Sequence, residues 1–149
     1  MRALLQRVSG CRVSVDGREV SRIGPGLLVL LGVSAADDES DADFIVNKVI
    51  NLRIFDDAEG KLNLSLAEVG GELMVVSQFT LYGDARKGRR PSYIAAAPPG
   101  RAQELYERVC DKFTSTGFPP GKGVFQAHMA VELVNDGPVT ILLESPAPA

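Results

Sequence analysis

The sequence predicts a single α/β domain, a three-layer sandwich in which a mixed sheet folds over itself and two main helices lie on one outer face. Three observations predict it. The 149 residues suit one domain, and a content of 45% hydrophobic and 23% charged residues is that of an ordinary globular protein. Segments with strand patterns outnumber helical ones. Two amphipathic helices are interleaved among these strands, which is typical of helices that pack on a sheet.

The first third of the chain has the pattern of strands separated by tight turns. Asp16-Gly17 is a hairpin turn signal, and Gly24-Pro25-Gly26 marks a second turn. The unbroken apolar run from Leu27 to Val33 is typical of a strand that is covered on both faces. The expected strands in this part are 4–8, 12–15, 20–23 and 27–33.

Two helices are predicted from apolar residues that recur about one turn apart. The first runs from about Asp38 to Asn51, since the acidic residues at its start suit a helix N-terminus. The second follows Pro98-Pro99-Gly100 and stops at Gly117. Its buried stripe is expected to consist of Ala102, Leu105, Tyr106, Val109, Cys110 and Phe113.

The other strands are expected at 54–55, 73–79, 129–134 and 139–143. The last two are predicted to be joined by Asn135-Asp136-Gly137-Pro138, whose residue types are all common in turns. We expect one domain over residues 1–144, followed by a flexible tail over 145–149.

The composition excludes several classes of protein. No apolar run approaches the ~20 residues of a membrane span, and the first residues do not form a signal peptide, so we expect a cytoplasmic location. Cys11 and Cys110 are far apart, and the single His128 cannot complete a zinc site with them by local spacing. We therefore expect no metal and no cofactor.

A basic cluster, Arg86, Lys87, Arg89 and Arg90, stands out in a chain of net charge −3. That charge does not suggest broad nucleic-acid binding, so any contact with RNA would be local. The cluster could bind the phosphates of a tRNA acceptor end, or it could be a solvated loop. A phosphate role predicts that affinity falls as the salt concentration rises.

Two short motifs carry the functional argument. Ser77-Gln78-Phe79-Thr80-Leu81 follows a buried strand, and polar groups at such a strand end are a common place for a site. The plainer interpretation is that these residues only end the strand. Asn135 to Thr140 resembles a hairpin turn, but the proline after Gly137 departs from the usual two-residue turn and permits a cis peptide. A Gly-Pro pair can present rigid, bare backbone.

Together these motifs resemble the D-aminoacyl-tRNA deacylase family, and the resemblance covers nearly the whole chain. The matching stretches are Leu5–Val8, Gly26–Val33, Arg53–Phe55, Asn63-Leu64, Val76–Leu81, Gly88–Ser92, Phe125, Met129 and Asn135–Thr140. One departure is Gln126, where the family usually has glycine, and this side chain could reshape a pocket wall. Tyr93 replaces a usual phenylalanine, which is a mild change.

The resemblance implies a D-aminoacyl-tRNA deacylase-like fold and a homodimer that acts on the acceptor end of tRNA. In it, Gly137 and Pro138 of one subunit carry a cis peptide and form a chirality filter over the partner's pocket. The resemblance assigns catalysis to Ser77, Gln78, Phe79 and Thr80. It assigns substrate binding or support to Arg7, Phe125, Met129 and Asn135.

The expected reaction is hydrolysis of the ester between a D-amino acid and the terminal ribose. Backbone N–H groups from Ser77 to Thr80 could stabilise the oxyanion. Thr80 is the obvious side-chain candidate for the nucleophile, but nothing in the sequence gives His128 an acid partner, which argues against a catalytic triad. The resemblance suggests that the substrate's own 2′-hydroxyl assists instead. A backbone filter should pass many D-amino acids and also achiral glycine.

Two other functions remain open at this point. A related editing domain that removes a wrong L-amino acid from tRNA is the nearest alternative, and Gly137-Pro138 argues against it. A dimeric ligand- or RNA-binding module without catalysis is the other. Turnover of D-aminoacyl-tRNA distinguishes them.

Overall fold

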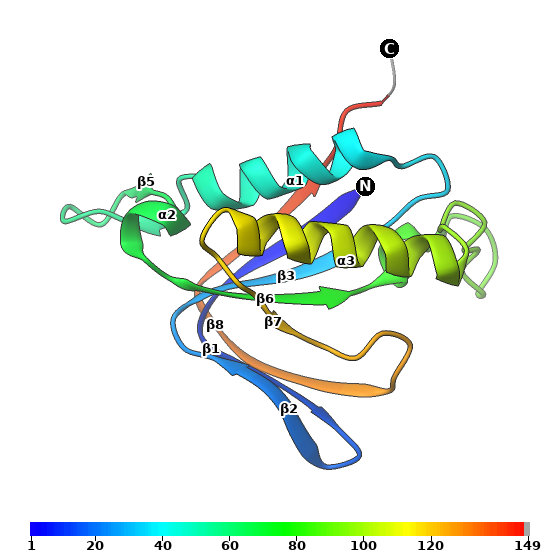
Figure 1. Ribbon diagram of the computed structural model, residues 1–149, viewed down its shortest axis with the longest axis horizontal. Coiled ribbons are helices and arrows are strands. Elements are labelled where there is room, and N and C mark those ends of the chain that lie inside the picture. The colour runs from blue at the N-terminus through cyan, green and yellow to red at the C-terminus, as the bar shows by residue number, and fades with distance from the viewer. Residues whose placement is uncertain (148–149) are drawn as a thin grey trace.

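A curled sheet dominates the computed structural model, which describes residues 1–147 (Figure 1). The sheet has six strands within those residues: β1 (Arg2–Val15), β2 (Arg18–Ile23), β3 (Gly26–Gly32), β6 (Glu72–Ser77), β7 (Gly121–Lys122) and β8 (Met129–Glu144). The order is β2-β1-β3-β6-β7, and β8 pairs with the other edge of β1. The β3–β6 and β6–β7 pairs are parallel and the others are antiparallel, which confirms the predicted mixed sheet.

The first strand is longer than the sequence suggested. The segments 4–8 and 12–15 were expected to be separate strands, but β1 runs through both. Its register against β8 shifts between Gln6 and Val8, and again between Val8 and Gly10. Such irregularities bend a strand without ending it. The sheet can therefore fold over itself while β1 remains continuous.

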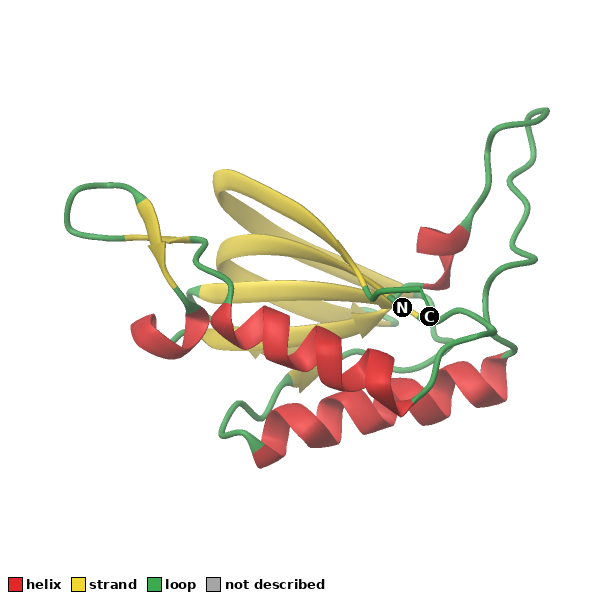
Figure 2. Cartoon of the chain, turned by 90° about the horizontal axis from the view of Figure 1, so that it is seen from above, coloured by secondary structure: helices red, strands yellow, loops and turns green. Residues whose placement is uncertain are grey.

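Two helices cover one face of the sheet, as predicted (Figure 2). Helix α1 (Glu39–Asn51) begins after Asp38, which forms a capping box with Asp41, and helix α3 (Pro99–Ser115) begins with a proline in its first turn. All six residues of the predicted stripe on α3 are buried.

Two clusters of buried residues define the three layers. The larger one lies between the helices and the sheet, and it includes Leu5, Val29 and Phe113. The smaller one lies on the other face, where Val13, Leu28 and Met74 pack together with the partly buried Val131 and other residues of the folded-over part.

The last strand contradicts the sequence-based expectation. The predicted strands 129–134 and 139–143 are one strand, β8, and residues 135–138 are not a hairpin turn. Both halves of β8 pair with β1 in the same direction, so the chain does not reverse at Gly137-Pro138.

Several short elements were not predicted or are shifted. The expected strand 54–55 is β4 (Phe55–Asp56), which pairs with β5 (Leu62–Leu64). Helix α2 (Leu66–Val69) and strand β7 were not anticipated. Ser145, the first residue of the expected tail, donates its backbone N–H to the Met1 carbonyl at 2.9 Å. Residues 148–149 lie outside the described part of the chain, and a tail over 145–149 stays a prediction.

Within residues 1–147, no helix is long and apolar enough to cross a membrane, and no group of histidine, cysteine and carboxylate side chains could hold a metal ion. Cys11 and Cys110 are free and buried, and burial raises the pKa of the Cys110 thiol to about 11.

Candidate active site

A cavity of about 680 Å³ lies at the carboxyl end of β6. Its walls come from the end of that strand, the loop before α3, the start of α3 and the segment that leads into β8. The lining residues are Val76, Ser77, Gln78, Phe79, Tyr93, Ala96, Ala97, Pro99, Ala102, Phe125, Gln126, Ala127, His128, Met129 and Val131. Three of the four predicted catalytic residues, Phe125 and Met129 are therefore brought together.

The SQFTL motif forms a strand end followed by a 3-10 turn. The expected strand 73–79 stops at Ser77, and the turn η1 covers Phe79–Tyr82. Gln78 donates its N–H to the carbonyl of Leu31 at 2.7 Å. The N–H groups of Phe79 and Thr80 begin the turn and have no acceptor among residues 1–147. Free N–H groups beside a cavity are suited to bind an oxyanion.

Thr80 and His128 do not form a nucleophile–base pair. The Thr80 hydroxyl accepts a hydrogen bond from the side-chain amide of Gln78, and Thr80 is not among the residues that line the cavity. His128 lines the cavity but is exposed and has no carboxylate partner within the described residues. Residues 1–147 therefore do not form a Ser/Thr-His-acid triad.

Aromatic side chains pack beside the cavity: Tyr106 is buried, and Phe125, which lines the cavity, is partly buried. The Tyr106 hydroxyl, from α3, donates to the carbonyl of Val75 at 2.8 Å, and burial raises the pKa of Tyr106. Phe125 lies against it with ring centroids 6.2 Å apart. Met129 accepts a contact from the Val124 N–H at 3.4 Å through its sulfur. Neutral, packed groups thus fix the position of β6 relative to α3.

Gly137 and Pro138 lie on a wide bulge in β8. On β1, Val8 pairs with Asn135 and Gln6 pairs with Thr140, so four residues of β8 stand opposite Arg7 alone. The Gly137-Pro138 peptide is cis, and both residues are exposed. Gly137 has φ +143°, a backbone conformation that a residue with a side chain rarely adopts.

Arg7 holds the bulge from one side. This side chain is only 7% exposed. Its Nε donates to the Asp136 carbonyl at 2.8 Å, and its Nη1 donates to the Ile54 carbonyl at 3.1 Å and contacts an Asp56 carboxylate oxygen at 3.3 Å. The guanidinium thereby ties the residue before Gly137 to the segment that follows α1.

Asn135 closes the bulge from within. Its side-chain oxygen accepts from the Val139 N–H at 2.8 Å, and its amide nitrogen donates to the Thr140 hydroxyl at 3.0 Å. The side chain replaces the strand pairing that the bulge interrupts, which leaves Gly137 and Pro138 projecting with few contacts of their own.

Within one chain, the bulge and the cavity are apart. Along β3, Leu27 pairs with Arg7, whereas Leu31 pairs with Ser77. Four residues of strand correspond to about 13 Å, and neither Gly137 nor Pro138 lines the cavity. The two motifs of one chain therefore do not line a common cavity.

The basic loop after η1 projects from the body of the molecule, at the right of Figures 1 and 2. Arg86 is paired with Asp84 through Nε and Nη2, at 2.8 and 2.7 Å, and this arginine lowers the pKa of Asp84 to about 2. Lys87, Arg89 and Arg90 form no ion pair within residues 1–147. The three unpaired cations, rather than Arg86, are free to meet phosphates.

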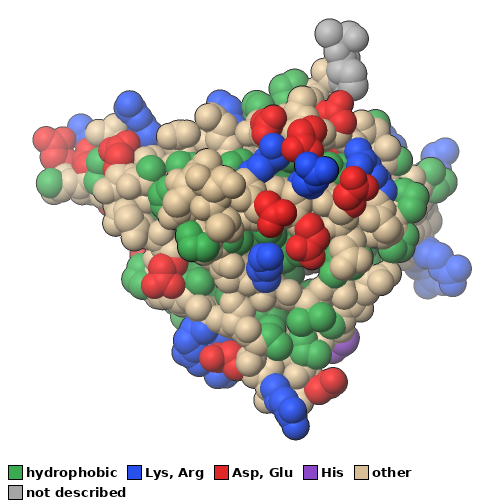
Figure 3. Space-filling model, viewed as in Figure 1, with side chains coloured by type: hydrophobic (Ala, Val, Ile, Leu, Met, Phe, Trp, Pro, Cys, Tyr) green, Lys and Arg blue, Asp and Glu red, His purple; other side chains and the backbone are tan. Residues whose placement is uncertain are grey.

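The helical face of the molecule carries charges of both signs (Figure 3). Acidic and basic side chains alternate over α1 and α3 (Figure 3). Lys112, for example, contacts Glu39 at 2.8 Å and Asp43 at 2.7 Å. No broad basic field is left on this face.

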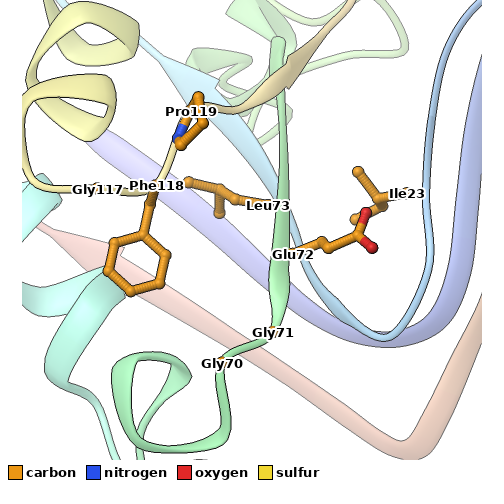
Figure 4. Close-up of a pocket in the computed structure, with 8 residues that line it drawn as sticks. All are labelled: Ile23, Gly70, Gly71, Glu72, Leu73, Gly117, Phe118 and Pro119. Carbon is orange, nitrogen blue, oxygen red and sulfur yellow. The ribbon is translucent and has the colours of Figure 1, made fainter.

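A second cavity, of about 420 Å³, lies at the opposite end of β6 (Figure 4). Among the described residues that line it, Glu72 is the only charged one, and its carboxylate accepts from the Gly24 N–H at 3.2 Å. No thiol, histidine or hydroxyl group lines this cavity, so the carboxyl end of β6 is the better candidate site.

One wall of the cavity was not predicted from the sequence as part of the site. Tyr93, Ala96 and Ala97 come from an irregular loop, and Ala102 was assigned only to the buried stripe of α3. Two sequence signals pointed to this loop: the matching run Gly88–Ser92, and Tyr93 itself, which stands where the family usually has phenylalanine.

Comparison with known proteins identifies relatives of this chain. Residues 4–144 match the family model of D-Tyr-tRNA(Tyr) deacylase. A D-aminoacyl-tRNA deacylase from Myxococcus xanthus is 60% identical over 149 residues, covering 100% of this chain and 97% of the relative. One from Kosmotoga olearia is 59% identical, covering 97% of both chains.

Solved structures share the fold. One of a protein named c-Myc DNA Unwinding Element Binding Protein has a TM-score of 0.94 and 41% identity, covering 99% of this chain and 100% of the other. Another, of a probable eukaryotic D-amino acid tRNA deacylase, has a TM-score of 0.81 and covers 95% of this chain and 97% of the other. At 19% identity this second likeness shows the fold alone. On the full-length family match and the close relatives, the chain belongs to the D-Tyr-tRNA(Tyr) deacylase family.

Proposed function

We propose that this protein hydrolyses the ester bond of D-aminoacyl-tRNA and releases a free D-amino acid and tRNA. Membership of a deacylase family supplies the reaction class. The observation that carries the proposal is the pair of free N–H groups, on Phe79 and Thr80, at the edge of a cavity that has no acid–base pair.

In the proposed reaction, water attacks the ester carbonyl and the N–H groups of Phe79 and Thr80 stabilise the developing oxyanion. One such donor is typically worth about 3–4 kcal/mol of barrier. The neighbouring 2′-hydroxyl of the terminal ribose assists proton transfer, because no hydroxyl–base pair lies at the cavity among residues 1–147. The enzyme contributes orientation, which can itself lower a barrier by several kcal/mol.

We propose that the protein is a homodimer in which Gly137 and Pro138 of the partner subunit distinguish D- from L-aminoacyl-tRNA. In the single chain this pair projects from its bulge without entering the cavity. The outer face of β8 also carries exposed apolar side chains such as Val134, which is 64% exposed, and Leu142. Such surface is typical of an interface between subunits. A second copy would cover it and could bring the Gly-Pro backbone to the pocket mouth.

A filter made of backbone crowds one face of the substrate's α-carbon and ignores the identity of the side chain. L-Aminoacyl-tRNA would meet this backbone, whereas D-aminoacyl-tRNA would not. Glycyl-tRNA has no side chain on either face and would pass. We therefore propose that mischarged glycyl-tRNA is also hydrolysed.

The unpaired cations Lys87, Arg89 and Arg90 are proposed to contact acceptor-end phosphates, since their loop follows directly on η1. Arg86 would contribute less because Asp84 already neutralises it. A cytoplasmic location, where aminoacyl-tRNA is present, stays a prediction.

The test is turnover by the purified protein of D-tyrosyl-tRNA, L-tyrosyl-tRNA and glycyl-tRNA, together with its mass in solution. The proposal predicts a dimer, release of D-tyrosine and glycine, and intact L-tyrosyl-tRNA. Release of the L-amino acid instead would identify an editing domain of the other kind. Binding of tRNA without release of any amino acid would identify a non-catalytic module.

The Thr80→Ala variant separates the two candidate nucleophiles. If the substrate's 2′-hydroxyl assists, the variant keeps part of its activity, because the Thr80 N–H remains. Complete loss with unchanged substrate binding would favour a Thr80 nucleophile.

A further inference from the structure

Arg2, at the start of β1, links that strand to the turn that carries the candidate oxyanion donors. Its Nη1 donates to the Leu81 carbonyl at 2.8 Å, and its guanidinium lies over the Tyr82 ring, 4.6 Å from the centroid. Its Nε also pairs with Glu144 of β8 at 2.9 Å. One planar side chain thus contacts a carbonyl, a ring and a carboxylate at once, a combination that suits arginine and that lysine cannot reproduce.

The turn η1 depends on such external contacts. A single 3-10 turn of four residues is not stable alone, and its last carbonyl groups have no partner within the turn. One side of η1 is fixed by close packing: a Cβ on Gly32 would lie 3.1 Å from the Gln78 carbonyl oxygen and 3.1 Å from Leu81 Cβ. The Arg2 contact satisfies the carbonyl of Leu81.

We propose that Arg2 is a positioning residue for deacylation, which fixes η1 so that the N–H groups of Phe79 and Thr80 meet the oxyanion at the right place. Arg2 does not line the cavity, so it acts through η1 and not on the substrate. This inference rests on the proposed oxyanion role of η1. It adds a residue that lies 79 positions away from Leu81 in the sequence.

The chain provides a closely matched control in Arg12. Arg2 forms an ion pair with Glu144, and Arg12 forms one with Glu132. In both pairs the arginine on β1 lies directly opposite the glutamate on β8. Both arginines are partly exposed. Only Arg2 reaches η1.

The experiment measures kcat and KM for D-tyrosyl-tRNA with wild type, Arg2→Leu, Arg2→Lys and Arg12→Leu. Loss of one oxyanion donor costs about 10²–10³ in kcat, so a misplaced turn should cost at least about ten-fold. We expect Arg2→Leu to lower kcat by that factor with KM changed less than two-fold. Arg2→Lys should be intermediate, since an ammonium can still donate to the Leu81 carbonyl. Arg12→Leu should keep kcat within two-fold.

The outcomes separate the inference from the function. If wild type does not release D-tyrosine, the proposed function is wrong. If wild type is active and Arg2→Leu equals Arg12→Leu in kcat, the positioning role is wrong while the function stands. A rise in KM alone would also overturn it, because that indicates a contact with bound tRNA. Thermal melting and dimer mass are measured for every variant, and Glu144→Gln shows what loss of the ion pair alone does. If Glu144→Gln lowers kcat as far as Arg2→Leu, the contact with Leu81 is not the cause and the inference fails.

Discussion

The contacts of Arg7 allow the sharpest prediction about the Gly137-Pro138 bulge. Arg7→Met keeps most of the aliphatic stem and removes the donors to the carbonyl groups of Asp136 and Ile54. Hydrogen bonds to charged groups contribute about 1.5–3 kcal/mol each. The contact with Asp56 adds at most about 1 kcal/mol, because that carboxylate is half exposed.

These contributions do not add fully. The Asp136 carbonyl lies on an exposed bulge and regains water, and removing a buried guanidinium also removes its desolvation cost. We therefore expect the free energy of unfolding to fall by about 3 kcal/mol, which for a domain of this size corresponds to roughly 6–12 °C in Tm. The matched control Arg22→Met, which removes an exposed pair with Glu19, should stay within about 0.5 kcal/mol of wild type.

The activity of Arg7→Met is measured as the ratio of deacylation rates for D- and L-tyrosyl-tRNA, alongside urea unfolding. A bulge that is no longer tied to Ile54 should discriminate less well, so the D/L ratio should fall by at least about ten-fold. A stability loss below about 1 kcal/mol would show that Arg7 does not hold the bulge. A large stability loss with an unchanged D/L ratio would refute the link between the bulge and chirality.

Three further predictions concern the bulge, the basic loop and the pocket wall. Gly137→Ala should lower D-aminoacyl-tRNA turnover at least about ten-fold, because its Cβ would lie 2.8 Å from Val139 Cγ2 and its φ of +143° costs about 1–3 kcal/mol for an L residue; single-turnover rates at the wild-type level would contradict this. Arg89→Ala should reduce the slope of log affinity against log salt by about 1, whereas Arg86→Ala should leave it nearly unchanged; equal effects on tRNA binding would show that the Arg86 ion pair opens in the complex. Gln126→Gly should raise the free energy of unfolding by about 0–1 kcal/mol. Glycine adopts the φ of +64° at this position without strain, and this gain outweighs the added freedom of the unfolded chain. A loss above about 1 kcal/mol in urea unfolding would contradict this.

The parts of the fold that the sequence predicted well are those with a local period. The stripe on α3 and the apolar run that became β3 each bury one contiguous surface, and a few neighbouring residues determine that pattern. The capping residue Asp38 is likewise a local signal. In these elements, tertiary packing reinforces the local preference.

The site depends instead on contacts between distant residues. Asn135-Asp136-Gly137-Pro138 has the composition of a turn, but it forms a bulge in a strand that pairs with β1 on both sides of Arg7. Local propensity cannot distinguish a hairpin from a bulge, because the distinction depends on which strand lies alongside. The end of β6 at Ser77 was also mispredicted. The apolar residues Phe79 and Leu81 continue the strand pattern, but they form a turn that packs on Gly32.

Strand β1 connects these two parts of the candidate site. Residues 3, 5 and 7 of β1 are buried while 2, 4 and 6 are half-buried, so Arg7 and Arg2 project from opposite faces. Arg7 holds the proposed chirality filter, and Arg2 holds the turn with the proposed oxyanion donors. If the filter acts across a dimer, each active site combines Arg2 of one subunit with Arg7 of the other.

In the proposed mechanism, backbone groups and not side chains select the substrate and stabilise the oxyanion. Activity should therefore depend on the residues that hold this backbone in place, such as Arg2 and Arg7. Mixed dimers test this directly. A dimer that carries Arg2→Leu in one subunit and Arg7→Met in the other should have both defects in one of its two sites and a wild-type second site, so about half of the wild-type turnover should remain.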